Sequence, residues 1–253
     1  MVELKNEKDL QGLRVSGKIL SRLLQILKKE VKSGIELKYL DEMAQKFLKE
    51  VGATSAFLGY KPEANSKPFP ATICTSVNEQ VVHGLPSDYI LKPGDILKID
   101  AGINYQNYIT DAALTIGIPP ISKTAKKLIK TTALALEKAI SQCWPEKRLG
   151  DIGWAIESTI GKTNFKIIKS LTGHGVGFEL HEEPVVYNYG RPATGLKLKQ
   201  GMVLAIEPML SVGSPDIKEC FDGSFATKDK SLTSHFEKTV AITSQGPEVL
   251  TKF

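Results

Sequence analysis

Four carboxylic acids interrupt segments of this chain that otherwise read as buried β-strands. They stand beside the largely apolar runs 96–99, 112–116, 202–206 and 239–242, as Asp100, Asp111, Glu207 and Glu237 respectively. A buried carboxylate is costly unless it is paired, hydrogen-bonded or bound to a metal ion. A fold that buries these strands must give the acids partners, and the pattern is typical of a metal site.

His174 is a fifth candidate ligand, and glycines on both sides let the backbone approach closely there. Divalent first-row metals accept carboxylate oxygen and imidazole nitrogen, and four acids with one histidine suit two ions that share bridging carboxylates. Four carboxylates nearly neutralise two such ions, which leaves a bridging water acidic enough to act near neutral pH. The set predicts metal-assisted hydrolysis.

Each of these residues also has a structural interpretation. One acid at a strand end is usually a solvated edge or turn residue, but four in one chain favour a shared site. His174 alone could be a turn histidine; its G-x-G-x-G setting is not the dinucleotide fingerprint, which argues against nucleotide binding. His83 and His181 are either polar surface residues or donors to a developing oxyanion. His235 is interpreted as structural.

Composition limits the class of protein to which the site can belong. The 253 residues include 42% apolar and 24% charged residues, ordinary values for a globular domain. The net charge of +5 allows weak attraction to a polyanion, although solvated helix faces explain most lysines. The three cysteines form no C-x-x-C pair, and no apolar run reaches the length of a membrane span. These features predict a soluble cytoplasmic protein.

Hydrophobic periodicity and turn residues predict the order of elements. We expect helices over residues 8–32, 37–51, 122–143 and 151–160, an irregular loop over 59–70, strands over 72–77 and 81–83, and strands with glycine-rich loops from 165 onward. Asp100 and Asp111 are expected to flank a turn-rich segment, residues 101–110, within an antiparallel pair. The order helix, helix, strands occurs twice, which is consistent with a duplicated half inside a single α+β domain.

Five separated motifs span nearly the whole chain: Ser76–Glu79 with His83–Pro86, Asp100–Gly102 with Asp111, Thr172–Gly175 with His181–Pro184, Ile206–Met209, and Phe236–Val240. In this order they resemble the motifs of type I methionine aminopeptidases, in the short bacterial form. The resemblance implies a pita-bread fold over residues 1–253, a pseudo-symmetric curved antiparallel sheet with helices on the outside and a dimetal site in its middle.

The resemblance also implies an activity, the removal of the initiator methionine from nascent polypeptides when the second residue is small. Two divalent ions (Co, Mn, Fe or Zn) would be held by Asp100, Asp111, His174, Glu207 and Glu237, with Asp111 and Glu237 bridging. Glu207 would be the general base, and His83 and His181 would stabilise the tetrahedral intermediate. A monomer with transient ribosome contact, but no specific nucleic acid or membrane partner, is expected.

The methionine pocket is expected to include Phe69 and Cys74 in its wall, with Leu180 and Phe225 as further candidates. The chain departs from the family at Leu180, where an aromatic residue is common, at Ser224–Phe225, where a tryptophan is common, and at Lys238, where histidine is common. Because Val2 is small, the same specificity predicts loss of Met1.

Two other functions fit parts of the pattern. A proline-directed aminopeptidase shares the fold and the ligands, but usually carries a sizeable N-terminal domain. A binding module of the same fold that has lost catalysis would typically lack some of the ligands, whereas all five are present here.

Overall fold

The computed structural model describes residues 2–61, 63 and 65–253. The predicted loss of Met1 and two positions of the predicted loop, 62 and 64, lie outside the described residues. The rest of that loop forms neither helix nor strand, as expected. Among the described helices, none is both long enough and apolar enough to cross a bilayer.

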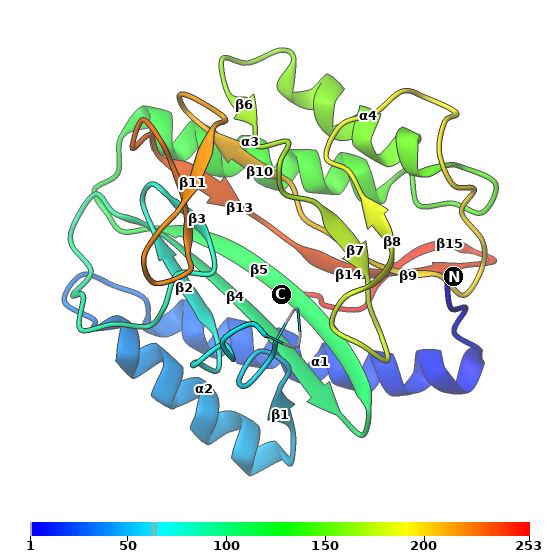
Figure 1. Cartoon of the computed structure of the whole chain (residues 1–253), viewed down its shortest axis with the longest axis horizontal. Coiled ribbons are helices and arrows are strands. Elements are labelled where there is room, and N and C mark those ends of the chain that lie inside the picture. The colour runs from blue at the N-terminus through cyan, green and yellow to red at the C-terminus, as the bar shows by residue number, and fades with distance from the viewer. Residues whose placement is uncertain (1, 62, 64) are drawn as a thin grey trace.

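The first half of the chain packs two helices against a four-stranded antiparallel sheet (Figure 1). Its elements are α1 (Glu7–Glu30), α2 (Leu37–Val51), β1 (Thr54–Ser55), β2 (Cys74–Val77), β4 (Ile96–Tyr105) and β5 (Tyr108–Gly117). Gly52 ends α2 in the left-handed conformation, with φ of 69°, as the sequence predicted. Apolar side chains of α1 and α2 meet those of β4 and β5 in one continuous core cluster.

The second half repeats the arrangement with a second helix pair and a five-stranded sheet in the order β15-β14-β9-β7-β8. Its helices are α3 (Lys123–Ile140) and α4 (Leu149–Ile160), and its sheet contains β7 (Gly173–Gly175), β8 (Glu182–Val186), β9 (Val203–Ile206), β14 (Lys238–Thr243) and β15 (Gly246–Val249). A separate core cluster joins α3 and α4 to β9 and β14. Each helix pair therefore stabilises its own half of the sheet.

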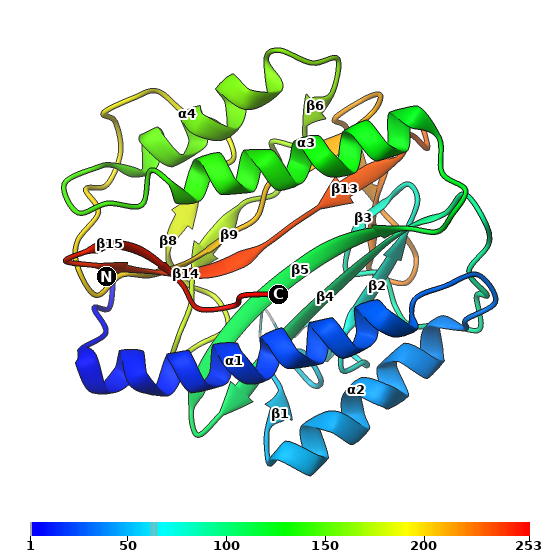
Figure 2. The ribbon, with the colours of Figure 1, turned by 180° about the vertical axis from the view of Figure 1, so that it is seen from behind.

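Two small sheets complete the fold. One contains β6 (Lys166–Ile167), β10 (Met209–Ser211) and β13 (Thr233–His235), and the other contains β3 (Gln80–Val82), β11 (Ile217–Glu219) and β12 (Phe225–Thr227). Seen from behind, the long helices α1 and α3 cross in front of the strands (Figure 2). The helices thus lie on the outside of antiparallel sheets, which confirms the predicted α+β class and pita-bread fold.

The segment between Asp100 and Asp111 was predicted wrongly. Residues 101–110 are not turn-rich: β4 and β5 run on to Tyr105 and Tyr108 and pair along their whole length. Only Gln106 and Asn107 turn, both with positive φ (53° and 66°), the conformation that tight two-residue hairpins require. Both acids therefore lie inside a long hairpin, where the sheet fixes their direction.

Replacement of Asn6 by alanine is expected to lower the free energy of unfolding by about 1 kcal/mol, because the side chain caps α1. Asn6 Oδ1 accepts hydrogen bonds from the backbone N–H groups of Lys8 (2.9 Å) and Asp9 (3.1 Å), and the Asp9 carboxylate accepts one from Asn6 N–H (3.0 Å). Urea denaturation measures the loss. Asn6→Asp keeps an acceptor and should stay near wild type; an equal loss in both variants would contradict the capping role.

Candidate metal centre

The hairpin β4–β5 places the first two acids on one face of the sheet. Gly102 pairs with Asp111 and Asp100 pairs with Ala113, so Asp100 and Asp111 are diagonal neighbours that point to the same side. Cys74 of β2 pairs with Asp100 and shares that face. A side chain at Gly102 would collide with Phe57, whose ring lies 2.6 Å from the ideal Cβ position. The sheet thus leaves space beside the acids for an aromatic neighbour.

Strands of the second half present the other three ligand candidates. His174 of β7 pairs with Ala205 of β9, and Glu207 follows two positions later on the same face. Thr239 of β14 also pairs with Ala205, which puts Glu237, two positions earlier, on that face as well. His174 Nε2 lies 3.5 Å from Glu207 Oε1. The two-residue side-chain period of the strands therefore gathers these groups on one face.

Hydrogen bonds between β5 and β14 join the two halves at the site. Asp111 N–H donates to Thr239 Oγ1 (2.9 Å), and that hydroxyl donates to the Asp111 carbonyl (2.7 Å). Glu237 N–H donates to the carbonyl of Ala113 (2.9 Å). These contacts hold two of the acids across the junction of the half-sheets.

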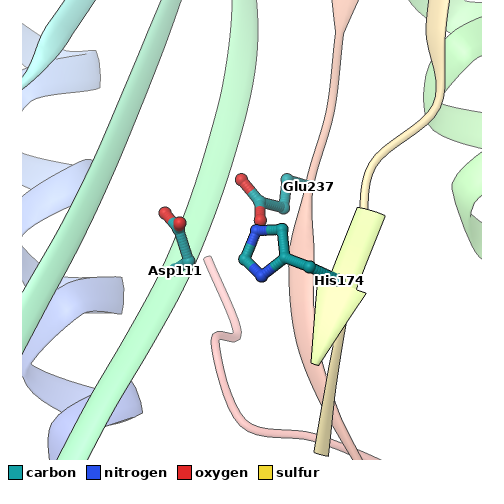
Figure 3. A group of neighbouring side chains, drawn as sticks. All are labelled: Asp111, His174 and Glu237. Atoms are coloured by element: carbon teal, nitrogen blue, oxygen red, sulfur yellow. The ribbon is translucent and has the colours of Figure 1, made fainter. Parts of the chain in front are cut away.

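The donor atoms converge closely enough to share a metal ion. One ligand atom each from Asp111, His174 and Glu237 lies within 4.8 Å of the others, and the same holds for Glu207, His235 and Glu237. Figure 3 shows the first group: Asp111 comes from β5, His174 from β7, and Glu237 directly precedes β14. Asp100 lies beside Asp111, and their carboxyl groups interact. All five residues predicted as ligands therefore lie together.

Burial shapes the protonation of the acids in the metal-free protein. Asp100, Asp111, Glu207 and Glu237 are at most 9% exposed. Burial raises the pKa of Asp111 to about 7. Burial first, and then the charges of neighbouring acids, raise the pKa values of the other three well above their ordinary values. A cation that supplied positive charge would reverse this effect.

Several buried polar atoms lack a partner in the described part of the chain. Five of them are atoms of the centre, namely Asp100 Oδ1, Asp111 Oδ1, Glu237 Oε1 and both ring nitrogens of His235; the others belong to Thr72, Thr75, Asn188 and Ser231. Buried polar groups are ordinarily hydrogen-bonded, so such atoms gathered in one place indicate a bound ion. Carboxylates and neutral imidazoles are the donors that divalent first-row metals accept, and the residues present therefore fit the metal that the sequence predicted.

His235 is the residue of this centre that the sequence analysis missed. It was interpreted as structural, yet its Nε2 lies 3.3 Å from Glu207 Oε2, opposite the oxygen that faces His174. Burial lowers its pKa to about 3, so the ring is neutral at physiological pH. Its place depends on the pairing of Met209 with His235 between β10 and β13. Only its two-residue spacing from Glu237 could have indicated a shared face.

His83 and His181 lie beside the centre from different elements. His83 follows β3 with a positive φ of 59° and packs against the ring of Phe225, with centroids 5.8 Å apart. The His181 ring packs edge-on against His174, with centroids 4.4 Å apart, and its Nδ1 lies 2.6 Å from Tyr60 Oη. Burial is the main cause that lowers both pKa values, so both imidazoles are neutral. Neutral rings can donate one hydrogen bond each without displacing a ligand.

An apolar cluster borders the acids and contains three of the four predicted pocket residues. Phe69 and Cys74 belong to it, as does Leu180, and Phe69 meets Phe57 edge-on with centroids 6.2 Å apart. The members not predicted as pocket residues include two aromatic ones, Phe57 and Tyr60. Both lie just after β1 in the segment 56–60, whose pattern resembles neither a core strand nor a helix. Phe225 lies outside this cluster and contacts His83 instead.

Two departures from the family pattern have local explanations. Lys238 points away from the acids, and its Nζ donates to the carbonyl of Thr251 (2.7 Å) in the C-terminal segment. Ser224 is buried, and its hydroxyl donates to Asp222 Oδ1 (2.7 Å) in the turn between β11 and β12. Neither of these hydrogen bonds involves a candidate ligand.

Comparison with known proteins agrees with the family resemblance found in the sequence motifs. The model of metallopeptidase family M24 matches residues 11–244. Methionine aminopeptidase of Clostridium perfringens is 43% identical over 252 residues, which cover 99% of each protein. The crystal structure of methionine aminopeptidase from Rickettsia prowazekii superposes with a TM-score of 0.95 at 36% identity, over 100% of each chain.

The proline-directed relatives are more distant. The prolidase of Pyrococcus horikoshii superposes with a TM-score of 0.77 at 22% identity, and this chain covers 63% of it, so the likeness shows a common fold alone. Full-length similarity at 43% identity lies instead with a methionine aminopeptidase. The chain therefore belongs to metallopeptidase family M24, and it is similar over its full length to methionine aminopeptidases of that family.

Proposed function

We propose that the chain removes the initiator methionine from nascent polypeptides whose second residue is small, and that it uses two divalent ions to do so. The observation that carries the two-ion proposal is the pair of donor groups that share Glu237, one with Asp111 and His174 and one with Glu207 and His235. A carboxylate common to both groups suits a bridging ligand.

Residues of both half-sheets would hold the ions, namely Asp100, Asp111, His174, Glu207 and Glu237, with His235 as a further donor beside Glu207. Bound divalent ions would polarise the scissile carbonyl and lower the pKa of water. The chain itself contributes fixed geometry, since Thr239 holds Asp111 across the junction and the sheet directs the acids. Glu207, once ionised, can accept a proton from the attacking water and transfer it to the leaving amine.

The cluster around Phe69 and Cys74 would receive the methionine side chain, because an apolar surface suits an unbranched thioether. His83, which follows β3, and His181, which precedes β8, would both contact the scissile amide. As neutral donors they can hydrogen-bond the carbonyl oxygen as negative charge develops on it. The preference for methionine and the chemistry of cleavage would thus depend on neighbouring but separate groups.

Replacement of His83 by alanine is expected to lower kcat by about 100-fold, the usual effect of removing one donor to a developing oxyanion. Methionine release from Met-Ala-Ser measures the effect, and metal content by elemental analysis should be unchanged because His83 is not a ligand. His83→Asn, which retains a donor, should recover part of the rate. A loss of bound metal in His83→Ala would assign the residue to the metal centre instead.

Metal dependence tests the proposed function directly. Metal-depleted protein should release no methionine from Met-Ala-Ser until Mn²⁺ or Co²⁺ is added, and calorimetric titration should show two ions bound per chain. Cleavage of a Gly-Pro peptide in preference to Met-Ala-Ser would favour the proline-directed alternative. Failure to bind metal and to cleave either peptide would favour the non-catalytic binding module.

We propose further that residues 1–253 act as one catalytic domain, as a monomer in the cytoplasm, with only transient ribosome contact. The hydrogen bonds between β5 and β14 support a single domain, because the centre is shared by both halves. The cysteine content supports a reducing compartment. Sedimentation with ribosomes at low and physiological salt tests the contact, which should weaken as salt rises.

A further inference from the structure

The ring of His181 has one close side-chain partner that no role above uses. Tyr60 Oη lies 2.6 Å from His181 Nδ1, and the two rings are tilted with centroids 5.2 Å apart. Tyr60 comes from the segment after β1, whereas His181 directly precedes β8. The contact therefore joins the two halves of the chain beside the metal centre.

The hydrogen bond has one favoured direction. A phenol hydroxyl can donate or accept a hydrogen bond, and an imidazole nitrogen does one or the other according to its tautomer. A distance of 2.6 Å is short for an N–H donor and ordinary for an O–H donor. The Tyr60 hydroxyl thus donates to Nδ1, which must carry the lone pair. In a neutral imidazole the proton then lies on Nε2.

The backbone of His181 is already held by other contacts. Glu182 Oε1 accepts hydrogen bonds from the N–H groups of Phe178 (2.7 Å) and Glu179 (3.1 Å), and its Oε2 forms a buried ion pair with Lys5. The side chain of Glu182 therefore holds the loop that precedes His181 in place. These contacts do not fix the tautomer of the imidazole. Tyr60 is hydrogen-bonded to the ring itself and can therefore fix the tautomer.

We propose that Tyr60 is a positioning residue that holds His181 in the Nε2–H tautomer, so that His181 presents a donor to the substrate carbonyl. The proposal rests on the role given to His181 in the proposed function. The proton must lie on His181 Nε2, because an Nε2 lone pair directed at the developing oxyanion would repel it. The ring of Tyr60 packs against the apolar cluster that contains Phe69 and Cys74.

Tyr60→Phe tests the proposal by removing one oxygen while keeping the ring. The chain has four histidines, so nitrogen-15 labelling of histidine gives a small set of signals, and a His181→Asn variant identifies those of His181. In zinc-loaded wild type we expect a protonated Nε2 and an unprotonated Nδ1. In Tyr60→Phe both nitrogen signals should move toward intermediate values, as expected for a mixture of tautomers.

Kinetics supply the second measurement. Tyr60→Phe should lower kcat for Met-Ala-Ser about three- to tenfold, the effect of one hydrogen bond, with KM unchanged. Tyr89→Phe is the matched control, because it removes another tyrosine hydroxyl, bound to Asp95 (2.9 Å), at a position outside the apolar cluster proposed to bind methionine. Its tautomer signals and kcat should match wild type.

Two results would overturn the proposal: a proton on His181 Nδ1 in wild type, or wild-type tautomer signals and kcat in Tyr60→Phe. Failure of the proposed function would look different. The wild type would then release no methionine with any metal, while the histidine signals would still report whether Tyr60 sets the tautomer.

Discussion

Glu207→Gln is expected to lower kcat/KM for Met-Ala-Ser by about 1,000-fold or more, the upper range for loss of a general base. Glutamine keeps the shape of the side chain but removes its negative charge and its ability to accept the proton. Glu207 is buried, and its two oxygens face His174 at 3.5 Å and His235 at 3.3 Å. The substitution therefore acts on the chemistry at the centre of the site and should leave the fold intact.

Glu219→Gln is the matched control for this variant, because Glu219 is an exposed acid on β11 that is not among the candidate ligands. It should retain wild-type activity. Far-ultraviolet circular dichroism and the melting temperature check that Glu207→Gln is folded. If a folded Glu207→Gln variant with a full metal complement kept activity within about tenfold of wild type, proton transfer would have to be assigned to another group.

The sequence was sufficient to indicate which acids lie together in the structure, because burial and charge conflict at single positions. An acid beside an apolar run is informative wherever it lies in the chain, and Asp100, Asp111, Glu207 and Glu237 all lie in the centre that this reasoning predicted. The helices were also predicted within a few residues, since their apolar periodicity is local. The predicted family and fold were confirmed by the comparisons.

What the sequence could not predict depends on contacts between distant residues. The end of the hairpin β4–β5, residues 104–107, is polar, and this local composition favours a turn. Pairing between the two strands nevertheless extends both of them to the two-residue turn. His235 faces Glu207 only because β13 pairs with β10 in a particular register. Phe57 and Tyr60 reach the site from an irregular segment whose path is fixed by tertiary contacts.

Metal binding to the metal-free protein is expected to release at least one proton. It should also raise the melting temperature by about 5–10 °C when the free metal concentration is about 100 times the dissociation constant. The four buried acids have raised pKa values, that of Asp111 being about 7, so near neutral pH the folded metal-free protein holds protons on them. A divalent ion requires the ionised ligands and displaces these protons.

The sign of the pH dependence follows from the same shifts. Unfolded carboxylates titrate near pH 4, so between pH 6.5 and 8 the folded metal-free protein binds more protons than the unfolded chain, and these acids destabilise it as the pH rises. Lys98 and Lys238, whose pKa values burial lowers to about 7, act in the opposite direction in this range. Comparing metal-loaded with metal-free protein largely removes the contribution of these lysines. The stabilisation by metal should therefore be larger at pH 8 than at pH 6.5.

Calorimetric titration with Mn²⁺ in two buffers of different ionisation enthalpy measures the protons released, and thermal denaturation at both pH values measures the stabilisation. The double variant Asp111→Asn, Glu237→Gln is the control, since it removes two of the titrating acids, and both effects should shrink. Equal stabilisation at pH 6.5 and pH 8 without proton release would mean that the acids are already ionised in the metal-free protein. Their burial would then have to be offset by cations or water that reach the site before the metal does.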